Sequence, residues 1–112
     1  MSFVEVAKWS DLLEHVCIVK KVGMHSILLC RQGEEVYALE NQCPHAGYGL
    51  GGGCFKNYVI RCPAHGHKFD VRTGFSIKNV DGFPIPCFPV QMRGRSIWVD
   101  LVRPFNFKRD RN

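Results

Sequence analysis

The 112-residue sequence contains no apolar run close to the roughly 20 residues that a membrane-spanning helix requires. Its first residues, "MSFVEVAKWSDLLEHV", do not place an apolar stretch after a basic one, as a secretory signal peptide would. No segment is of low complexity, and no long stretch has the apolar spacing of an amphipathic helix. We therefore expect a cytoplasmic globular protein that does not enter a membrane, with a single domain over residues 1–112.

Negative charge is scarce near the C-terminus. The formal charge of the chain is +5, and residues 103–112 contribute +3 of it, because four basic residues stand there beside the single acid Asp110. Such a basic tail could contact nucleic acid or an acidic protein. A solvated terminal segment is the simpler interpretation, and we expect no nucleic-acid partner.

Strand-like runs dominate the chain. β-branched, aromatic and other apolar residues recur in them, often alternating with polar ones, as in strands with one buried face. The runs are "FVEVA" (3–7), "HVCIVKKV" (15–22), "ILLCRQ" (27–32), "VYALE" (36–40) and "SIWVDL" (96–101). Gly33 and the "RGR" segment at 93–95 predict hairpin turns. The one helix candidate is "WSDLLEHV" (9–16), where Ser10 or Asp11 could cap a single turn or two. The sequence predicts an all-β fold.

The composition changes between residues 43 and 87. This segment holds most of the glycines and four of the six prolines. We interpret it as a loop-rich lobe inserted between strands of a base domain, with "NYVIRC" (57–62) and "HKFDV" (67–71) as short strands inside it. Loops displayed by a rigid β scaffold commonly contain binding residues, so we expect the functional site in this lobe.

The six cysteines do not predict a disulfide framework. The sequence shows no export signal, and a domain of this size does not need covalent crosslinks to be stable. Cys17 and Cys30 lie in apolar strand-like runs, which indicates small buried side chains. Cys54 and Cys87 belong to no recognisable motif and receive no predicted role.

Two of the cysteines stand beside histidines with a regular spacing. The chain reads Cys43-x-His45, then sixteen residues, then Cys62-x-x-His65. A structural zinc site with two cysteines and two histidines is one candidate. Zinc modules, however, usually take both thiolates from one loop, whereas each loop here supplies one sulfur and one nitrogen. This mixed arrangement favours a binuclear centre with both cysteines on one metal and both histidines on the other, as in a Rieske [2Fe–2S] cluster.

The flanks of these pairs resemble the Rieske family. "CPH" and "CPAH" match the pattern C-x-H…C-x-x-H, with "LGGG" and "YVIRCP" before the second loop and "GHKFDVRTG" after it. The resemblance covers about residues 36–90. It implies an antiparallel β-sandwich or barrel base domain with a smaller cluster-binding lobe. It also implies one [2Fe–2S] cluster per chain, with Cys43 and Cys62 on the inner iron and His45 and His65 on the outer, more exposed iron.

The resemblance extends to the surroundings of the cluster. The glycines of "YGLGGG" are expected to let backbone approach the cluster and to donate N–H groups to its sulfurs, and Gly74 to adopt a positive φ. "DGFPIP" is similar to the family's proline-containing third loop, so Pro84 or Pro86 would cover the cluster. His67 lies outside the ligand pattern. His67 and Phe69 stand where high-potential members have two hydroxyl donors, which implies a low-potential cluster.

The resemblance also implies a function. Soluble members of this type carry single electrons from an NAD(P)H-dependent flavin reductase to a terminal oxygenase, often one that hydroxylates aromatic rings. With 112 residues the chain has no room for an oxygenase or flavin domain, so we expect a monomeric carrier that is not itself an enzyme. The exposed edges of His45 and His65 would be the docking point and the exit for the electron, with Tyr48 and Leu50 beside them.

Two matters remain open from the sequence. Residues 54–79 contain five basic residues against Asp70 alone, which predicts acidic partners and salt-sensitive transfer. The alternatives are the Rieske-like small subunit of an assimilatory nitrite reductase, a carrier for a diiron monooxygenase and, more remotely, a zinc-stabilised binding module.

Overall fold

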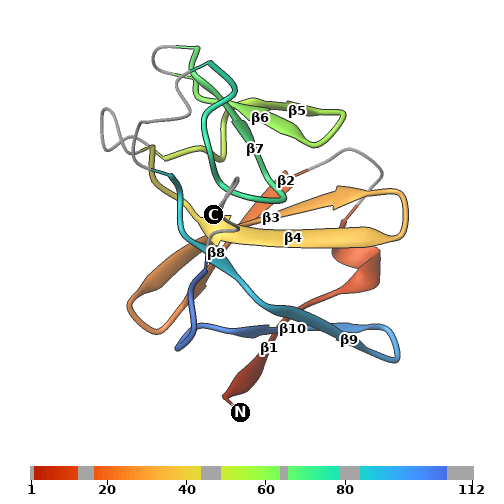
Figure 1. Cartoon of the computed structure of the whole chain (residues 1–112). Coiled ribbons are helices and arrows are strands. Elements are labelled where there is room, and N and C mark those ends of the chain that lie inside the picture. Colours follow the sequence, from red (N-terminus) through yellow and green to blue (C-terminus); the bar gives the residue numbers. More distant parts are fainter. Residues whose placement is uncertain (1, 13–16, 44–48, 64–65, 79–83, 106–112) are drawn as a thin grey trace, which may run out of the picture.

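The computed structural model describes residues 2–12, 17–43, 49–63, 66–78 and 84–105, in which ten strands form three antiparallel sheets (Figure 1). One short 3-10 turn, η1 (Trp9–Asp11), is the only helical element in this part of the chain. The predicted all-β fold is therefore confirmed.

Two of the sheets form the base of the molecule. Their strands are β1 (Phe3–Lys8), β10 (Ser96–Asp100) and β9 (Val90–Arg93) in one sheet, and β2 (Cys17–Val22), β3 (His25–Gln32), β4 (Glu35–Glu40) and β8 (Cys87–Phe88) in the other. A shared core of aliphatic side chains, among them Ile27, Leu29, Ile97 and Val99, fills the space between them. This two-sheet arrangement matches the predicted sandwich-like base domain.

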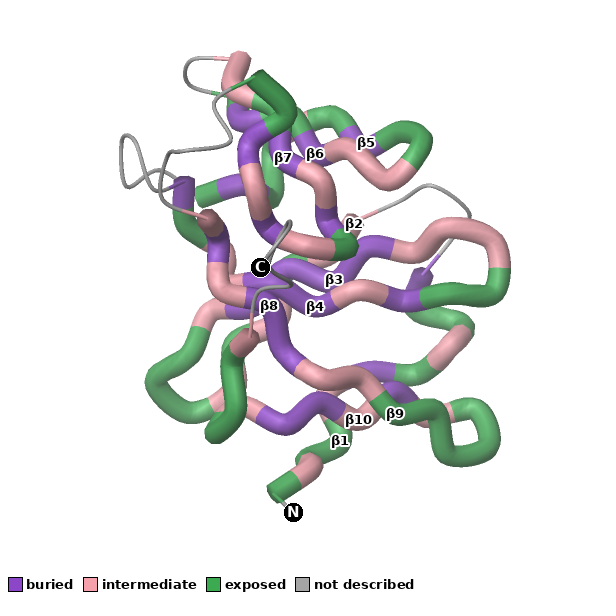
Figure 2. The backbone as a smooth tube through the Cα atoms, in the orientation of Figure 1, coloured by how far each residue is buried: buried purple, intermediate pink, exposed green. Residues whose placement is uncertain are grey.

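The third sheet forms a lobe above the base (Figure 1). Its strands are β5 (Cys54–Lys56), β6 (Val59–Arg61) and β7 (Lys68–Asp70), and all lie within the segment 43–87. A second core joins this lobe to the base: Phe55, Ile60 and Phe69 pack in one cluster with Leu28 and Leu39 of the base. Figure 2 accordingly shows buried segments both in the lobe strands β6 and β7 and in strands β3 and β4 of the base.

Strand β3 lies between the two cores and is buried on both faces. Ile27 and Leu29 face the base core, whereas Leu28 and Cys30 face the lobe core, because successive side chains of a strand point to opposite sides. This explains why "ILLC" is a continuous apolar run rather than an alternating one. The tight turns beside it are made by Gly23 and Gly33, which have positive φ values of 60° and 64°.

Of the one or two helical turns predicted over residues 9–16, the structure describes a single 3-10 turn, and its N-cap is Lys8 rather than Ser10 or Asp11. Only the 3-10 turn forms, Leu12 is extended, with φ −113° and ψ 125°, and residues 13–16 lie outside the described residues. Asp11 does not begin the turn; its carboxylate accepts the backbone N–H of Lys8 at 2.9 Å. The chain leaves the helical path here because Leu12 is inserted into the base core, where it is 1% exposed.

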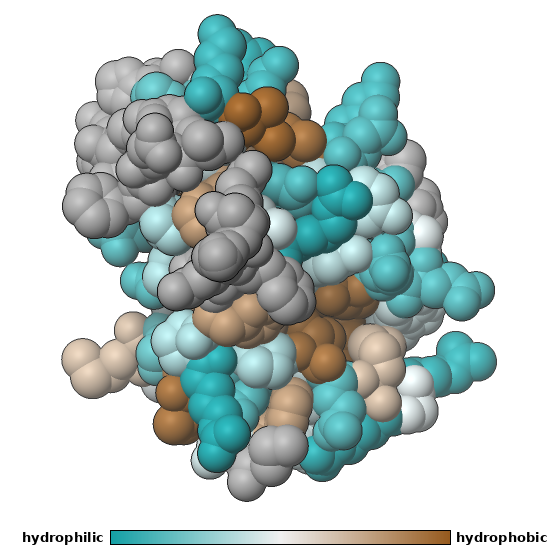
Figure 3. Space-filling view, viewed as in Figure 1, coloured by the Kyte–Doolittle hydropathy of each residue, from teal (hydrophilic) through white to brown (hydrophobic). Residues whose placement is uncertain are grey.

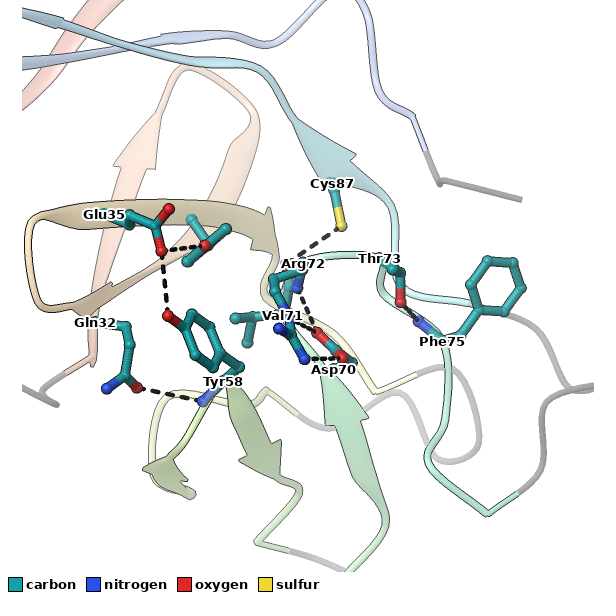
Figure 4. A network of polar contacts seen from close by, with 10 residues as sticks. Gln32, Glu35, Tyr58, Asp70, Val71, Arg72, Thr73, Phe75 and Cys87 are labelled. Atoms are coloured by element: carbon teal, nitrogen blue, oxygen red, sulfur yellow. Dashed lines mark hydrogen bonds and ion pairs between the residues drawn. The ribbon is translucent and has the colours of Figure 1, made fainter. Parts of the chain in front are cut away.

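A group of polar contacts fixes the lobe to the hairpin β3–β4 (Figure 4). The backbone N–H of Tyr58, in the β5–β6 turn, donates to Gln32 Oε1 at 3.2 Å, and its hydroxyl donates to Glu35 at 3.3 Å. The guanidinium of Arg72 lies 4.3 Å from the centre of the Tyr58 ring and pairs with Asp70 at 2.8 Å. The bonds to Gln32 and Glu35 therefore join this turn to the base, and the contacts of Arg72 hold the Tyr58 ring within the lobe.

The segment predicted as a basic tail begins inside the fold. Phe105 is half-buried and exchanges two backbone hydrogen bonds with Cys87, at 3.0 and 2.7 Å. Residues 106–112 lie outside the described residues.

Candidate metal centre

The two predicted cysteine ligands follow strands of different sheets and meet in one core. Cys43 comes after β4 and Cys62 directly after β6, and their side chains are 0% and 1% exposed within the cluster that joins lobe and base. Neither cysteine is in a disulfide. His45 and His65 lie outside the described residues, and so does Tyr48. The structure therefore brings together the sulfur half of the predicted ligand set.

The first ligand loop is closed at its base by a side chain that the sequence did not single out. Asn41 Oδ1 accepts the backbone N–H groups of Leu50 at 2.7 Å and Gly51 at 3.1 Å, and its amide nitrogen donates to Ser26 Oγ at 3.2 Å. The two ends of the loop that contains Cys43 are thus tied to each other and to β3. A single asparagine after a strand has no distinctive sequence pattern, and its partners are distant along the chain.

The second ligand loop is closed by its own backbone. The N–H of Cys62 donates to the His67 carbonyl at 2.7 Å, and the N–H of Gly66 donates to the Cys62 carbonyl at 2.9 Å. Gly66 has a φ of +75°, a conformation that favours glycine. The loop between these residues contains the position of His65, so the folded lobe fixes where that loop begins and ends.

The backbone that leaves the first ligand loop packs so closely against β6, the strand that leads into the second loop, that a side chain would not fit. A Cβ atom added at Gly53 would lie 1.9 Å from the backbone oxygen of Arg61, immediately before Cys62. This contact requires glycine at position 53, whereas the predicted approach of the glycine-rich backbone to the cluster stays a prediction. The predicted role of its N–H groups needs correction: the Gly51 N–H donates to Asn41 and the Gly53 N–H donates to the Leu50 carbonyl at 2.9 Å, so neither is directed to a sulfur.

The proline segment passes beside the lobe core. Ile85 is fully buried, and its N–H donates to the Gly74 carbonyl at 2.8 Å, while Pro84 and Pro86 are half-buried. Gly74 has a φ of 83°, as predicted. Residues 79–83 lie outside the described residues, so the covering role of either proline stays a prediction.

The remaining cysteines differ in their surroundings. Cys54 is exposed on β5. Cys87 is buried, and its thiol lies 3.8 Å from the carbonyl oxygen of Val71 and 3.6 Å from that of Ile85. Burial, with a smaller effect from the charge of Asp70, raises the pKa of Cys87 to about 12. Cys87 therefore stays a neutral packing group at ordinary pH.

A pocket with basic walls adjoins the second ligand loop. It has a volume of about 390 Å³ and is lined by Gly66, His67, Lys68, Ser76, Ile77 and Lys78. Lys68 and Lys78 are exposed, whereas Arg72 on the same lobe already pairs with Asp70. Hydrophilic side chains gather on the upper part of the lobe (Figure 3). Part of the positive charge predicted for residues 54–79 therefore lies on the walls of a pocket next to Gly66, at the end of the second ligand loop.

The donor set fits a mixed cysteine–histidine iron centre. Two buried thiols from different loops suit an iron held by two thiolates, and the loop ends described above leave one histidine position in each loop. Phe69, which the resemblance puts at the place of a hydroxyl donor, is fully buried in β7, and its relation to the cluster stays a prediction. No group of three or more cysteine, histidine or acidic side chains forms among the described residues, two of the four predicted ligands lying outside them.

Comparison with known proteins identifies this arrangement. The Rieske [2Fe-2S] domain model matches residues 2–89. The chain is 31% identical over 101 residues to the ferredoxin component of biphenyl 2,3-dioxygenase from Rhodococcus jostii (strain RHA1), covering 90% of this chain and 94% of the relative. Fold, donor set and relatives together define an iron–sulfur electron-transfer protein. The chain belongs to the Rieske [2Fe–2S] domain family and is a ferredoxin, so its predicted cluster type is confirmed, and its relatives are electron-transfer components rather than catalysts.

Solved structures agree with this assignment. The ferredoxin of carbazole 1,9a-dioxygenase from Nocardioides aromaticivorans IC177 superposes with a TM-score of 0.81 and 33% identity, covering 88% of this chain and 97% of that one. A chain in a complex of reduced oxygenase and oxidised ferredoxin of carbazole 1,9a-dioxygenase gives 0.79 at 28% identity, covering 87% and 91%. A chain described as an NADH-dependent nitrite reductase small subunit from Mycobacterium tuberculosis reaches 0.78 at 15% identity, covering 87% and 92%, which shows the fold alone. In the described part of this chain, no helix is long and apolar enough to cross a membrane.

Proposed function

We propose that Cys43, His45, Cys62 and His65 bind the [2Fe–2S] cluster, the cysteines on the inner iron and the histidines on the outer one. The observation that supports this most strongly is the position of the two thiols. Cys43 and Cys62 come from separate loops, are buried in one core, and follow strands whose loops are closed at their bases. The motif then places one histidine in each loop.

When bound, the cluster accepts and releases one electron, at potentials between roughly −150 and +300 mV across Rieske centres. The chain's own residues determine where in this range it operates. A hydroxyl donating to a cluster sulfur would stabilise the more negative reduced state. Because Phe69 occupies its buried position without a hydroxyl, we place the potential of this protein toward the low end.

We infer that the electron is delivered by an NAD(P)H-dependent flavin reductase and passed to a terminal oxygenase, with an aromatic-ring dioxygenase as the acceptor. The relatives named as ferredoxin components of dioxygenase systems support this, and the structural neighbour from the oxygenase–ferredoxin complex supports docking on an oxygenase. We further propose that the carrier works as a monomer in the cytoplasm. The nitrite reductase alternative gains no support beyond the shared fold.

The contact with these partners would lie on the lobe, around the histidine loops. The basic pocket beside the second loop would receive acidic side chains of the partner, with Lys68 and Lys78 on its walls. Electrostatic attraction of this kind raises the association rate and is weakened by salt.

Electron transfer itself tests the proposed function. The protein would be reduced with a flavin reductase and NADH, then mixed in a stopped-flow instrument with the oxidised terminal oxygenase of a biphenyl or carbazole dioxygenase system. We expect the visible absorption of the oxidised ferredoxin to return within the turnover time of the oxygenase. Reoxidation no faster than in buffer alone, combined with rapid reoxidation by a nitrite reductase large subunit, would overturn the assignment in favour of the alternative.

A further inference from the structure

Cys17 and Cys30 stand opposite each other on neighbouring strands. They are register partners in the antiparallel pair β2–β3, which is closed by the two-residue turn Gly23–Met24 between Val22 and His25. The pair flanking such a turn is hydrogen-bonded, and hydrogen-bonded and non-hydrogen-bonded pairs alternate from there. Val22–His25 is the pair next to the turn, and Cys17–Cys30 is the fifth pair beyond it, so Cys17–Cys30 is a non-hydrogen-bonded pair.

The spacing of such a pair is compatible with a covalent link. Directly opposed residues in non-hydrogen-bonded pairs have Cα atoms about 4.5 Å apart. Disulfides span Cα distances of roughly 4.4 to 6.8 Å. The backbone register therefore allows the two sulfur atoms to bond without a change in strand pairing.

The two thiols also differ in their access to solvent. Cys30 is fully buried, whereas Cys17 is half-buried and packs at the edge of the same core that contains Cys43 and Cys62. Burial and the adjacent thiol of Cys17 raise the pKa of Cys30. A soluble oxidant would consequently meet Cys17 first, and Cys30 would react only with a group already attached to its neighbour.

We propose that Cys17 and Cys30 form a reversible redox site, which low-molecular-weight disulfides such as glutathione disulfide convert to a cross-strand disulfide. The Cys17 thiolate attacks one sulfur of glutathione disulfide, forming a mixed disulfide and releasing one glutathione. The Cys30 thiolate then attacks the Cys17 sulfur, forming the protein disulfide and releasing the second glutathione. The two protein thiols lose two electrons and two protons, and the glutathione disulfide is reduced to two thiols.

The position of this pair gives the oxidation a structural consequence. Val19, two residues along β2 on the same face, lies under the first ligand loop, since a Cβ added at Gly51 would be 2.4 Å from its Cγ2 atom. A bond between Cys17 and Cys30 would fix β2 to β3 directly below this contact. We therefore expect the protein with the Cys17–Cys30 disulfide to lose its cluster more slowly on heating than the protein in which both cysteines are thiols.

The experiment uses the cluster-loaded protein. It is incubated with glutathione disulfide, the remaining thiols are trapped with N-ethylmaleimide, and disulfide-linked peptides are mapped by mass spectrometry. We expect a Cys17–Cys30 link that reduced glutathione reverses, with the visible spectrum of the cluster retained throughout. Exposed Cys54 is the internal control: its register partner is Arg61 rather than a cysteine, so it should form the mixed disulfide with glutathione and react no further. Recovery of Cys17 as a stable glutathione adduct, or of both thiols alkylated, would overturn the proposal.

Two variants separate the steps. Cys30→Ser removes the resolving thiol, so Cys17 should accumulate as a mixed disulfide with glutathione. Cys17→Ser removes the accessible thiol, so Cys30 should remain unmodified. Equal glutathionylation of Cys17 in the wild-type protein and in Cys30→Ser would contradict the pairing. This readout is measured on Cys17 itself and does not depend on how much cluster either protein contains.

Discussion

The side chain of Asn41 closes the first ligand loop by accepting the backbone N–H of Leu50 at 2.7 Å. The same oxygen accepts the N–H of Gly51, and the amide nitrogen holds Ser26 on β3. One uncharged residue outside the Cys–His motif thus joins the entry of the loop, its exit and the base domain. Positioning of the cluster therefore depends on a residue that is not expected to touch iron.

Replacing Asn41 with Ala should weaken both the fold and cluster retention. Two backbone N–H groups would lose their acceptor. The N–H of buried Leu50 would be left unsatisfied at a cost of about 1–3 kcal/mol, whereas that of exposed Gly51 can bond water. We expect a lower midpoint of thermal unfolding and faster loss of visible absorption at moderate temperature. Ser26→Ala is the matched control and should have a smaller effect, because it removes only the hydrogen bond that the Asn41 amide donates to Ser26 Oγ. Equal behaviour of the two variants would show that the loop closes without Asn41.

Gly53→Ala should prevent normal cluster assembly. The added Cβ would lie 1.9 Å from the Arg61 carbonyl oxygen, so the start of β5 and the end of β6, which lead out of the first ligand loop and into the second, would have to separate. Gly52→Ala is the control, because its Cβ would meet nothing closer than Pro63 Cγ at 3.9 Å. Iron and sulfide content of the purified variants measures the effect. Full cluster content in Gly53→Ala would contradict the close approach of these two segments.

Phe69→Tyr should raise the reduction potential. The new hydroxyl would take the place of a donor found in high-potential members of the family. A hydrogen bond to a charged acceptor is worth about 1.5 kcal/mol, which for one electron corresponds to a rise of up to roughly 60 mV. Spectroelectrochemical titration measures the shift, with Phe55→Tyr on β5 as a control for added polarity in the lobe core. An unchanged potential in Phe69→Tyr would place its hydroxyl away from the cluster sulfurs.

Reversing the charge of Lys68 and Lys78 should slow electron transfer to the oxygenase. The double variant K68E/K78E removes the positive walls of the pocket beside the second ligand loop. We expect a reduced second-order rate constant at low ionic strength and a weaker dependence on salt than in the wild-type protein. Lys21→Glu on β2 of the base makes the same charge change as each of the single variants K68E and K78E, and it should leave the rate near that of the wild type, whereas each of those two should slow transfer. If K21E slows transfer as much as K68E/K78E, the pocket is not the contact site.

Much of the fold was predictable from the sequence because strands follow simple rules. Alternating runs predicted β1, β4 and β10, and Gly33 predicted the turn between β3 and β4. The helical candidate over residues 9–16 forms only as a 3-10 turn at Trp9–Asp11, because the local pattern does not show that Leu12 is inserted into the base core. Tertiary packing decides the backbone there.

The sequence motif proposes the ligands of the candidate site, but the sequence does not indicate the residues that support the ligand loops. Cysteine and histidine at fixed spacing form a rare pattern, so Cys43 and Cys62 could be identified before their common burial was known. Asn41 could not, since its three partners lie 9, 10 and 15 residues away. The pairing of Cys17 with Cys30 likewise depends on strand register, which a single sequence does not determine.

The ligand assignment is tested most directly by visible absorption and low-temperature EPR of the purified protein, before and after reduction with dithionite. The wild-type protein should be red-brown and give, when reduced, the rhombic signal of a [2Fe–2S] cluster with mixed cysteine and histidine ligands. His45→Ala and His65→Ala should lose this signal, while His67→Ala, outside the motif, should keep it. An intact Rieske spectrum in either ligand variant, or a colourless wild-type protein with stoichiometric zinc, would contradict the assignment.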